Sequence, residues 1–248
     1  MIMNERFSRT ELLFGKEKIH RLADSRVAVF GIGGVGGYVV EALARSGIGS
    51  LDLIDRDVVS VSNINRQIIA LDSTVGQYKA EAAAQRARDI NPEIKVQTYN
   101  TFFTPENADS FDFSQYDYIV DAVDTVSAKT ELIVRAEKAG VPIISSMGAG
   151  NKLDPTAFEI ADIYKTSVCP LARVMRRELK ARGIKKLTVV YSKEEPKKIF
   201  PPVIDEASGK AVPASYACVP SVVGLIIASR VIRDLTAASC RPPVRGER

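Results

Sequence analysis

The chain has 248 residues, 46% hydrophobic and 26% charged, a composition typical of one substantial α/β domain or two small ones. Its net charge of +4 permits an acidic partner without demanding one. The cysteines Cys169, Cys218 and Cys240 share no CxxC spacing, so neither a disulfide framework nor a structural zinc site is indicated.

Neither a secretory signal nor a membrane span is visible in the sequence. Residues 1–9 carry charges and lack an apolar core. The most apolar run, residues 219–228, is too short to cross a bilayer and contains Pro220 and Gly224. We therefore expect a cytoplasmic protein without a membrane partner.

The first quarter of the chain alternates between helices and strands. The apolar spacing of residues 4–22 predicts a helix, with Arg9 near its start. Residues 27–32 form the first predicted strand, residues 36–46 the next helix and residues 51–54 the second strand.

The turn after the first strand has the glycine pattern of a nucleotide-binding loop. Gly31 permits a tight turn, Gly33 lets backbone N–H groups approach a phosphate, and Gly36 lets the helix pack close to the strand. Asp55, at the end of the second strand, is placed to bond ribose hydroxyls. NAD is the default ligand of such a turn, and residues further along the chain argue against it.

A polar loop at residues 57–67 carries Asn63, Arg66 and Gln67 just beyond Asp55. An arginine in this place is suited to a polyphosphate, because its fork of donors can grip two oxygens at once. Residues 75–90 then predict a helix with Lys79 near its start. Taken alone, a lysine there is more often solvated than catalytic.

Two acids follow a later strand. Further strands are predicted over residues 95–99, 116–122 and 141–147, with a helix over residues 126–139. Asp121 and Asp124 lie just past the second of these strands, at the edge where open parallel sheets bind ligands. One acid could hold Mg²⁺ on a phosphate, and either could instead cap the following helix.

The remainder of the chain no longer alternates regularly between strands and helices. Strands over residues 158–163 and 187–192 bracket a basic helix over residues 171–182, and an apolar helix covers residues 221–235. Residues 193–214 read as a mobile loop, and residues 239–248 as a disordered tail.

The predicted fold is α/β, a doubly wound (Rossmann-like), mainly parallel sheet with an extended C-terminal part. It forms one domain over residues 1–238. Residues 1–150 are its nucleotide-binding half and residues 151–238 its substrate and dimer half.

These motifs occur together, in the same order, in a known family. The sequence resembles the ubiquitin-activating-like adenylating enzymes at Arg6-Phe7-Ser8-Arg9, the Gly31–Gly36 turn, Asp55-Arg56-Asp57, Ser62-Asn63-Ile64-Asn65-Arg66-Gln67, Lys79 and Asp121-Ala122-Val123-Asp124. The resemblance implies ATP rather than NAD, and attack of a carboxylate on the α-phosphate to give an acyl-adenylate and pyrophosphate.

The family also implies roles for individual residues. Asp55 would hold the ribose, and Asp124 would organise Mg²⁺. The implied catalytic set is Arg9, Arg66, Lys79 and Asp124, with Arg9 reaching into the site of a second copy in a homodimer. The implied nucleotide-binding set is Gly31, Gly33, Gly34, Gly36, Asp55, Asp57, Asn63, Arg66, Gln67, Lys79 and Asp124.

The second half resembles one branch of this family, the tRNA threonylcarbamoyladenosine dehydratases. The similar segments are residues 167–184 and 219–224. The resemblance implies that the threonyl carboxylate of the modified adenosine in tRNA is adenylated, and that its carbamoyl group then closes a ring and expels AMP. A monovalent cation and a sulfur-transfer partner are open additions.

Two other functions are weighed against this one. The chain could activate a small sulfur-carrier protein ending in Gly-Gly for thiamin or molybdopterin synthesis, but it lacks the pair of CxxC zinc motifs usual in those enzymes. It could also be a non-catalytic nucleotide-binding scaffold, although the full set Arg9, Arg66, Lys79 and Asp124 argues against that.

The basic helix is the candidate RNA contact. Its cations recur at three- and four-residue steps and would share one face: Arg173, Arg176, Arg177 and Lys180. A solvated surface helix is the alternative. The cysteines and the single histidine, His20, are left out of the catalytic set.

Overall fold

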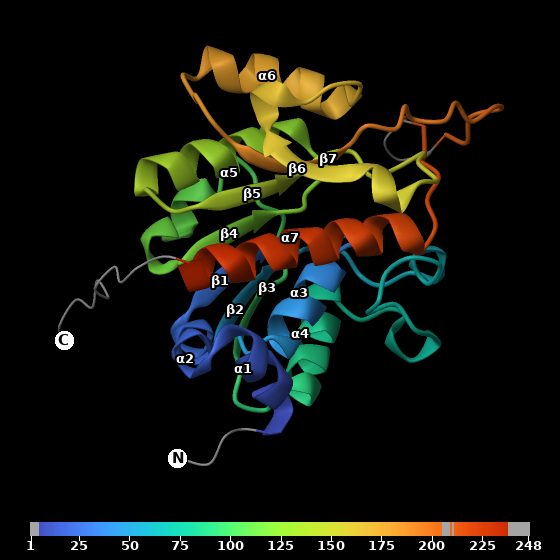
Figure 1. Cartoon of the computed structure of the whole chain (residues 1–248). Helices are drawn as coiled ribbons and strands as arrows, with labels where there is room; N and C mark the ends of the chain where they lie inside the picture. The colour runs from blue at the N-terminus through green and yellow to red at the C-terminus, as the bar shows by residue number, and fades with distance from the viewer. Residues whose placement is uncertain (1–4, 205–208, 210, 238–248) are drawn as a thin grey trace.

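A computed structural model describes residues 5–204, 209 and 211–237. Its centre is a seven-stranded sheet in the order β3-β2-β1-β4-β5-β7-β6 (Figure 1). The strands are β1 (Arg26–Phe30), β2 (Ser50–Ile54), β3 (Lys95–Tyr99), β4 (Tyr118–Asp121), β5 (Ile143–Ser146), β6 (Phe158–Asp162) and β7 (Thr188–Ser192). All neighbouring pairs are parallel except β6 and β7. The predicted mainly parallel, doubly wound sheet is confirmed.

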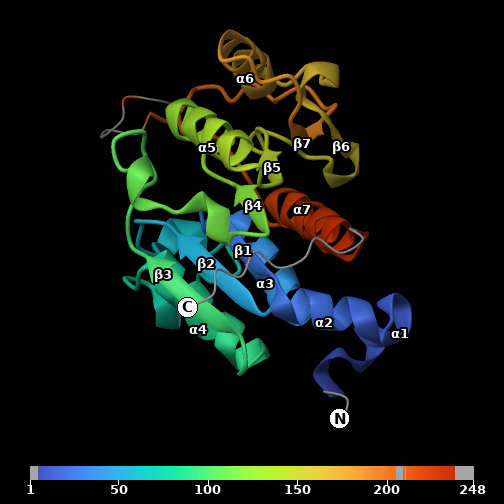
Figure 2. The same ribbon diagram turned by 90° about the vertical axis from the view of Figure 1, so that its left-hand side faces the viewer.

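Helices cover both faces of the sheet (Figures 1 and 2). They are α1 (Ser8–Phe14), α2 (Lys16–Asp24), α3 (Gly36–Arg45), α4 (Lys79–Ile90), α5 (Val126–Ala139), α6 (Pro170–Ala181) and α7 (Cys218–Ala237). None of them, within the described residues, combines the length and apolarity that a membrane crossing requires.

The first strand shows why two layers form. Side chains alternate along a strand, and Val27 and Val29 belong to the core beneath α3, α4 and α7, whereas Ala28 and Phe30 belong to the core beneath α5. An apolar strand buried on both faces therefore joins the two cores. A third cluster packs α6 against β7 and α5.

The order of the strands determines where a ligand can bind. Strand β1 pairs with β2 on one side and β4 on the other, so the chain reverses its direction of winding between them. In such sheets the ligand lies outside the carboxyl ends of the strands at this reversal. The segments that follow β1, β2, β4 and β5 meet there.

Two predicted helices have different bounds. The single helix predicted over residues 4–22 is broken at Gly15, which has φ +86° and separates α1 from α2. The helix predicted from residue 75 begins at Lys79, because Gly76 has φ +89° and Val58 pairs with Tyr78 in an isolated bridge. Both misses come from glycines that adopt a left-handed conformation.

Two further expectations concern the tail and the division of the domain. The predicted tail over residues 239–248 lies outside the described residues. The division of one domain into halves at residue 150 stays a prediction, although a single sheet does contain strands from both halves.

Candidate nucleotide site

A cavity of about 700 Å³ opens at the carboxyl edge of the sheet. Its walls come from the segments after β1, β2, β3, β4 and β5 and from residues 213–220. The predicted nucleotide-binding residues that line it are Gly31, Gly33, Gly34, Asp55, Asp57, Asn63, Arg66, Gln67, Lys79 and Asp124. Folding thus brings residues scattered over nearly a hundred positions into one pocket.

The structure requires a glycine at some positions of the turn and not at others. Gly31 has φ +89°, and a Cβ on it would lie 2.7 Å from the carbonyl oxygen of Ala122. A Cβ on Gly36, which does not line the cavity, would lie 1.8 Å from the carbonyl oxygen of Gly31. A Cβ on Gly33 would meet no atom closer than 3.9 Å. Gly31 and Gly36 are therefore required by packing, and Gly33 leaves space for a ligand.

Asp55 fixes the turn from the second strand. Its Oδ2 accepts a hydrogen bond from the Ile32 N–H at 2.6 Å, and its Oδ1 accepts one from the Asp57 N–H at 2.8 Å. Burial raises the pKa of the Asp55 carboxyl, although these two donors and Lys79 act in the opposite direction. The carboxylate lies on the cavity wall with lone pairs left for a ligand hydroxyl.

The cations of the site are held by local partners. Lys79 Nζ lies 2.7 Å from Asp57 Oδ2, and the lysine side chain is only 9% exposed. The Arg66 guanidinium donates to the carbonyl of Ser62 at 2.8 Å and to Oδ1 of Asn65 at 2.9 Å. Each cation is thus oriented toward the cavity edge, with hydrogen-bonding capacity remaining for an anion.

A buried, unpaired amide oxygen tests whether the pocket fits a polar ligand. Oε1 of Gln67 is buried and, among the described residues, has no hydrogen-bond partner. Leaving such an atom unpaired costs roughly 1–3 kcal/mol. Gln67 lines the cavity, and its Nε2 is the atom nearest a Cβ built on Gly33, at 3.9 Å, so this side chain borders the space that a polar ligand would fill.

The two acids at the end of β4 have distinct surroundings. Asp121 is fully buried, and its Oδ2 accepts hydrogen bonds from Lys129 Nζ at 2.9 Å and from the Ser145 hydroxyl. Asp124 is exposed and lines the cavity. Neither caps α5: the residue before that helix is Thr125, and no side chain caps it. The capping alternative is therefore wrong for both acids.

Arg9 does not belong to the cavity of its own chain. It is exposed, is absent from the cavity lining and belongs to α1, which lies beyond α2 at the outer end of the N-terminal helices (Figure 2). Phe7 packs beside Gly47, which precedes the N-terminal end of β2. Arg9 therefore lies near the sheet edge opposite the cavity.

The basic helix α6 presents most of its predicted RNA-binding residues to solvent. Arg173, Arg177 and Lys180 are exposed, whereas Arg176 is half-buried and donates to the carbonyl of Thr166 at 3.1 Å. The helix begins close to the cavity wall. A Cβ on Gly148, just before the lining residues 149 and 150, would lie 3.8 Å from Sγ of Cys169.

Sequence reasoning missed part of the lining. Residues 101–104 follow β3 and line one end of the cavity, where the Arg56 guanidinium lies 5.0 Å from the centre of the Phe102 ring. Their place after a predicted strand was a usable signal. Pro213 and Ser215 also line the cavity but come from a long loop, which gives no such signal.

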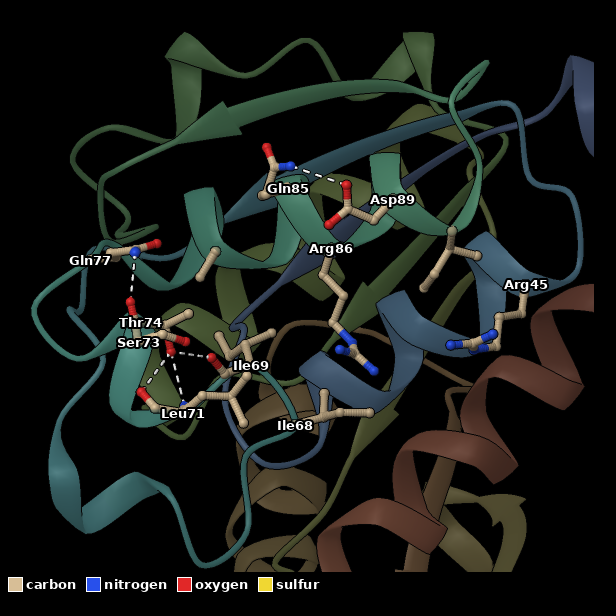
Figure 3. Close-up of a pocket in the computed structure, with 12 residues that line it drawn as sticks. Arg45, Ile68, Ile69, Leu71, Ser73, Thr74, Gln77, Gln85, Arg86 and Asp89 are labelled. Carbon is tan, nitrogen blue, oxygen red and sulfur yellow. Dashed lines mark hydrogen bonds between the residues drawn. The ribbon is translucent and has the colours of Figure 1, made fainter.

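A second groove, of about 560 Å³, lies between α3, α4 and residues 68–77 (Figure 3). Its two arginines, Arg45 and Arg86, are both paired with Glu41 of α3. The groove contains none of the predicted site residues, and both of its arginines are already paired with a carboxylate of the protein. It is not assigned to the nucleotide.

The fold and the site define a nucleotide-binding α/β protein, with a glycine turn at the reversal point of a parallel sheet. The chain belongs to the ThiF family, whose model matches residues 7–245. Across 242 residues it is 46% identical to the tRNA threonylcarbamoyladenosine dehydratase of Bacillus subtilis. The match covers 94% of this chain and 95% of that protein. The family resemblance read from the motifs is confirmed.

Two solved structures of the E. coli tRNA N6-threonylcarbamoyladenosine dehydratase have the same fold. The complex with AMP has a TM-score of 0.85 at 36% identity and covers 96% of this chain and 97% of that one. The complex with ATP has a TM-score of 0.84 at 34% identity and covers 96% and 98%.

Proposed function

We propose that this protein is an ATP-dependent tRNA threonylcarbamoyladenosine dehydratase. The observation that carries the proposal is 46% identity over 94% of the chain to a dehydratase of that name, joined to a cavity lined by the adenylation motifs. A related dehydratase has been solved with ATP and, separately, with AMP, the nucleotides that enter and leave such a reaction.

The geometry of the cavity supports one orientation of the nucleotide. Strands β3 and β5 are separated in the sheet by β2, β1 and β4, so residues 101–104 and residues 149–150 lie at opposite ends of the cavity. The base binds at the first end, and Asp55 accepts from the ribose. The phosphates lie at the glycine turn, where α3 begins and its N-terminal N–H groups favour an anion.

Asn63, Arg66 and Lys79 grip the phosphates in this assignment, and Gln67 Oε1 accepts a donor of the ligand. Lys79 exchanges part of its contact with Asp57 for a phosphate oxygen. Fixed cations in a water-poor cavity stabilise the transition state most where negative charge grows. The attacking carboxylate is already ionised at neutral pH, so no general base is required.

Asp124 is the residue that would hold Mg²⁺. The described residues contain no cluster of three His, Cys, Asp or Glu side chains suited to a metal ion. This fits Mg²⁺, which is commonly bound through one or two carboxylates, with phosphates and waters completing its shell. When bound, the ion neutralises charge on the departing pyrophosphate. A monovalent cation remains an open addition.

The chemistry proceeds in two displacements. A threonyl carboxylate oxygen attacks the α-phosphorus, and the bond to pyrophosphate breaks. The carbamoyl group of the same nucleoside then attacks the acyl carbon and gives up a proton to solvent, a ring closes, and AMP leaves with the former carboxylate oxygen. The net change in the nucleoside is loss of water.

We also propose that Arg9 completes the site of a second copy in a homodimer. Its exposure on α1, at the sheet edge opposite the cavity, supports contact with another subunit rather than its own. The cytoplasm, where tRNA is modified, is the expected location. Contact with a sulfur-transfer protein stays a prediction.

The reaction itself is the direct test. Native protein with MgATP and tRNA carrying threonylcarbamoyladenosine is expected to form one AMP and one pyrophosphate for each nucleoside that loses water, as measured by nucleotide chromatography and nucleoside mass spectrometry. The alternative, activation of a small sulfur-carrier protein, predicts ATP–pyrophosphate exchange only when that carrier is added. Exchange that depends on a carrier and ignores the modified tRNA would rule out the dehydratase.

The basic helix gives a separate prediction. The double substitution Arg173→Glu and Arg177→Glu is expected to weaken tRNA binding at least tenfold at low salt and to lower the slope of log affinity against log salt by about two, because each phosphate contact releases a counterion. Filter binding over a salt series measures both. ATP affinity serves as the control and should stay unchanged. Unaltered tRNA affinity would return α6 to a solvated surface helix.

A further inference from the structure

One wall of the cavity comes from a segment that no sequence motif marks. Residues 211–217, here the return segment, lead back from a long excursion into α7, and its members Pro213 and Ser215 line the cavity. They lie at the end formed by Ala149 and Gly150, opposite residues 101–104. If the proposed function holds, this is the acyl end, where the carboxylate meets the α-phosphate.

Asn151 ties the return segment to the loop after β5. Its N–H donates to the carbonyl of Ala214 at 2.7 Å, and its Oδ1 accepts from the N–H of Ala214 at 2.7 Å. Its own carbonyl accepts from the N–H of Lys197, on the outgoing part of the excursion, at 2.7 Å. One residue therefore joins both limbs of the excursion to the body of the protein.

The residue type suits this task. Asn151 has φ +59°, a left-handed conformation that asparagine tolerates better than most side chains. Its amide oxygen also acts as a second carbonyl toward Ala214. The fit is close on both sides, because a Cβ on Gly150 would lie 2.8 Å from Cβ of Pro213.

A second asparagine holds the same segment from the other side and reaches a phosphate-gripping cation. Nδ2 of Asn65 donates to the carbonyl of Ser215 at 3.0 Å, and its Oδ1 accepts from the Arg66 guanidinium at 2.9 Å. Arg66 keeps another partner, the carbonyl of Ser62. The amide of Asn65 thus bridges the wall and the cation.

We propose that Asn151 and Asn65 are positioning residues, which hold residues 213–215 as the wall of the acyl end and join that wall to Arg66. Neither is assigned to the bond-making step. The proposal rests on the proposed function, because only an acyl substrate gives that end a reacting partner. Through the wall, Asn151 affects binding of the acyl substrate alone. Asn65 also contacts Arg66 and therefore affects binding of both the acyl substrate and ATP.

Substitutions can separate the two ties. Asn151→Gly keeps the left-handed backbone and removes only the side-chain bond to Ala214. Asn65→Ala removes the bonds to both Ser215 and Arg66. Ser110→Ala removes one exposed side-chain bond, to the carbonyl of Asn107, away from the cavity, and is the matched control.

Asn151→Gly is expected to raise the KM for the modified tRNA about fivefold, the usual effect of one hydrogen bond, and to leave ATP affinity unchanged. Asn65→Ala is expected to raise both the KM for tRNA and the Kd for ATP about fivefold. Asn151→Asp retains the acceptor and the backbone tolerance, so its KM is expected within about twofold of the native value. Ser110→Ala should match the native protein in both the KM for tRNA and the Kd for ATP.

The double variant tests whether the two residues act through one segment. If both hold residues 213–215, Asn151→Gly with Asn65→Ala is expected to raise the tRNA KM about five- to tenfold rather than the product of about 25-fold. Both single variants are expected to unfold at the native thermal midpoint.

Three results would overturn the inference while native activity is intact: single variants equal to Ser110→Ala, fully multiplicative effects in the double variant, or a fall in thermal midpoint that accounts for the loss. Failure of the proposed function has a different signature. In that case the native protein itself does not convert the modified tRNA.

Discussion

Replacing Lys79 by alanine is expected to lower ATP–pyrophosphate exchange by roughly 10²- to 10³-fold, because it removes a fixed cation from the place where phosphate charge develops. The lysine is nearly buried on the cavity wall, and its Nζ lies 2.7 Å from Asp57. A water molecule that entered the space left by the side chain would not supply its positive charge. The exchange assay, run with saturating ATP and modified tRNA, measures the loss. The matched control is Lys138→Ala, an exposed lysine at the end of α5, which should keep native activity. A Lys79→Ala protein with more than a tenth of the native rate would contradict the phosphate-gripping role.

The same variant tests whether Arg9 acts on a second copy. Arg9→Ala and Lys79→Ala proteins are each expected to be inactive. After subunits exchange at random in a dimer, half of the dimers contain one copy of each, and one of their two sites has both native residues. A mixture is then expected to recover about one quarter of the native rate. A mixture that stays inactive would place Arg9 in the site of its own chain or outside any site.

Lys129→Met is expected to destabilise the protein by roughly 3–5 kcal/mol, because it leaves the Asp121 carboxylate buried without its counterion. Both side chains are fully buried, and Lys129 Nζ lies 2.9 Å from Asp121 and 3.3 Å from the Ser145 hydroxyl. Urea unfolding of the apo protein measures the change in free energy of unfolding.

Two comparisons identify the cause of that loss. Lys138→Met, on the exposed side of the same helix, should stay within about 0.5 kcal/mol of the native protein. Adding Asp121→Asn to Lys129→Met removes the uncompensated charge and should recover part of the stability. If Lys129→Met alone lowers the free energy of unfolding by less than about 1 kcal/mol, the ion pair does not stabilise the fold as expected.

The first part of the fold could be predicted well from the sequence, because its strands and turn follow from short stretches of neighbouring residues. The apolar run before Gly31 and the acid at Asp55 predict a strand, a turn and a second strand without reference to the rest of the chain. The cavity lining then contains Gly31, Asp55 and the Asn63–Gln67 segment as expected. Their roles toward ATP are proposals.

Other features depend on distant contacts and could not be read from the sequence. Asp121 and Asp124 look equivalent in the sequence, and only the burial of Lys129 at 0% exposure assigns Asp121 to an ion pair. Likewise, Ser215 lies in a stretch without periodicity. Its place at the cavity follows from its own bond to Asn65 and from the bonds of its neighbours Ala214 and Tyr216 to residues 151 and 153. Long-range contacts of this kind leave no local signature.

Main chain packs directly on main chain at the glycine turn after β1, since side chains at Gly31 or Gly36 would collide with carbonyl oxygens. That part of the molecule offers almost no freedom to evolution or to an engineer. At the rim of residues 101–104, Phe103 is buried against Phe30, whereas Thr101, Phe102 and Thr104 are exposed or partly exposed and leave more room for change. A redesign for a different nucleobase should therefore begin at that rim and leave the turn untouched.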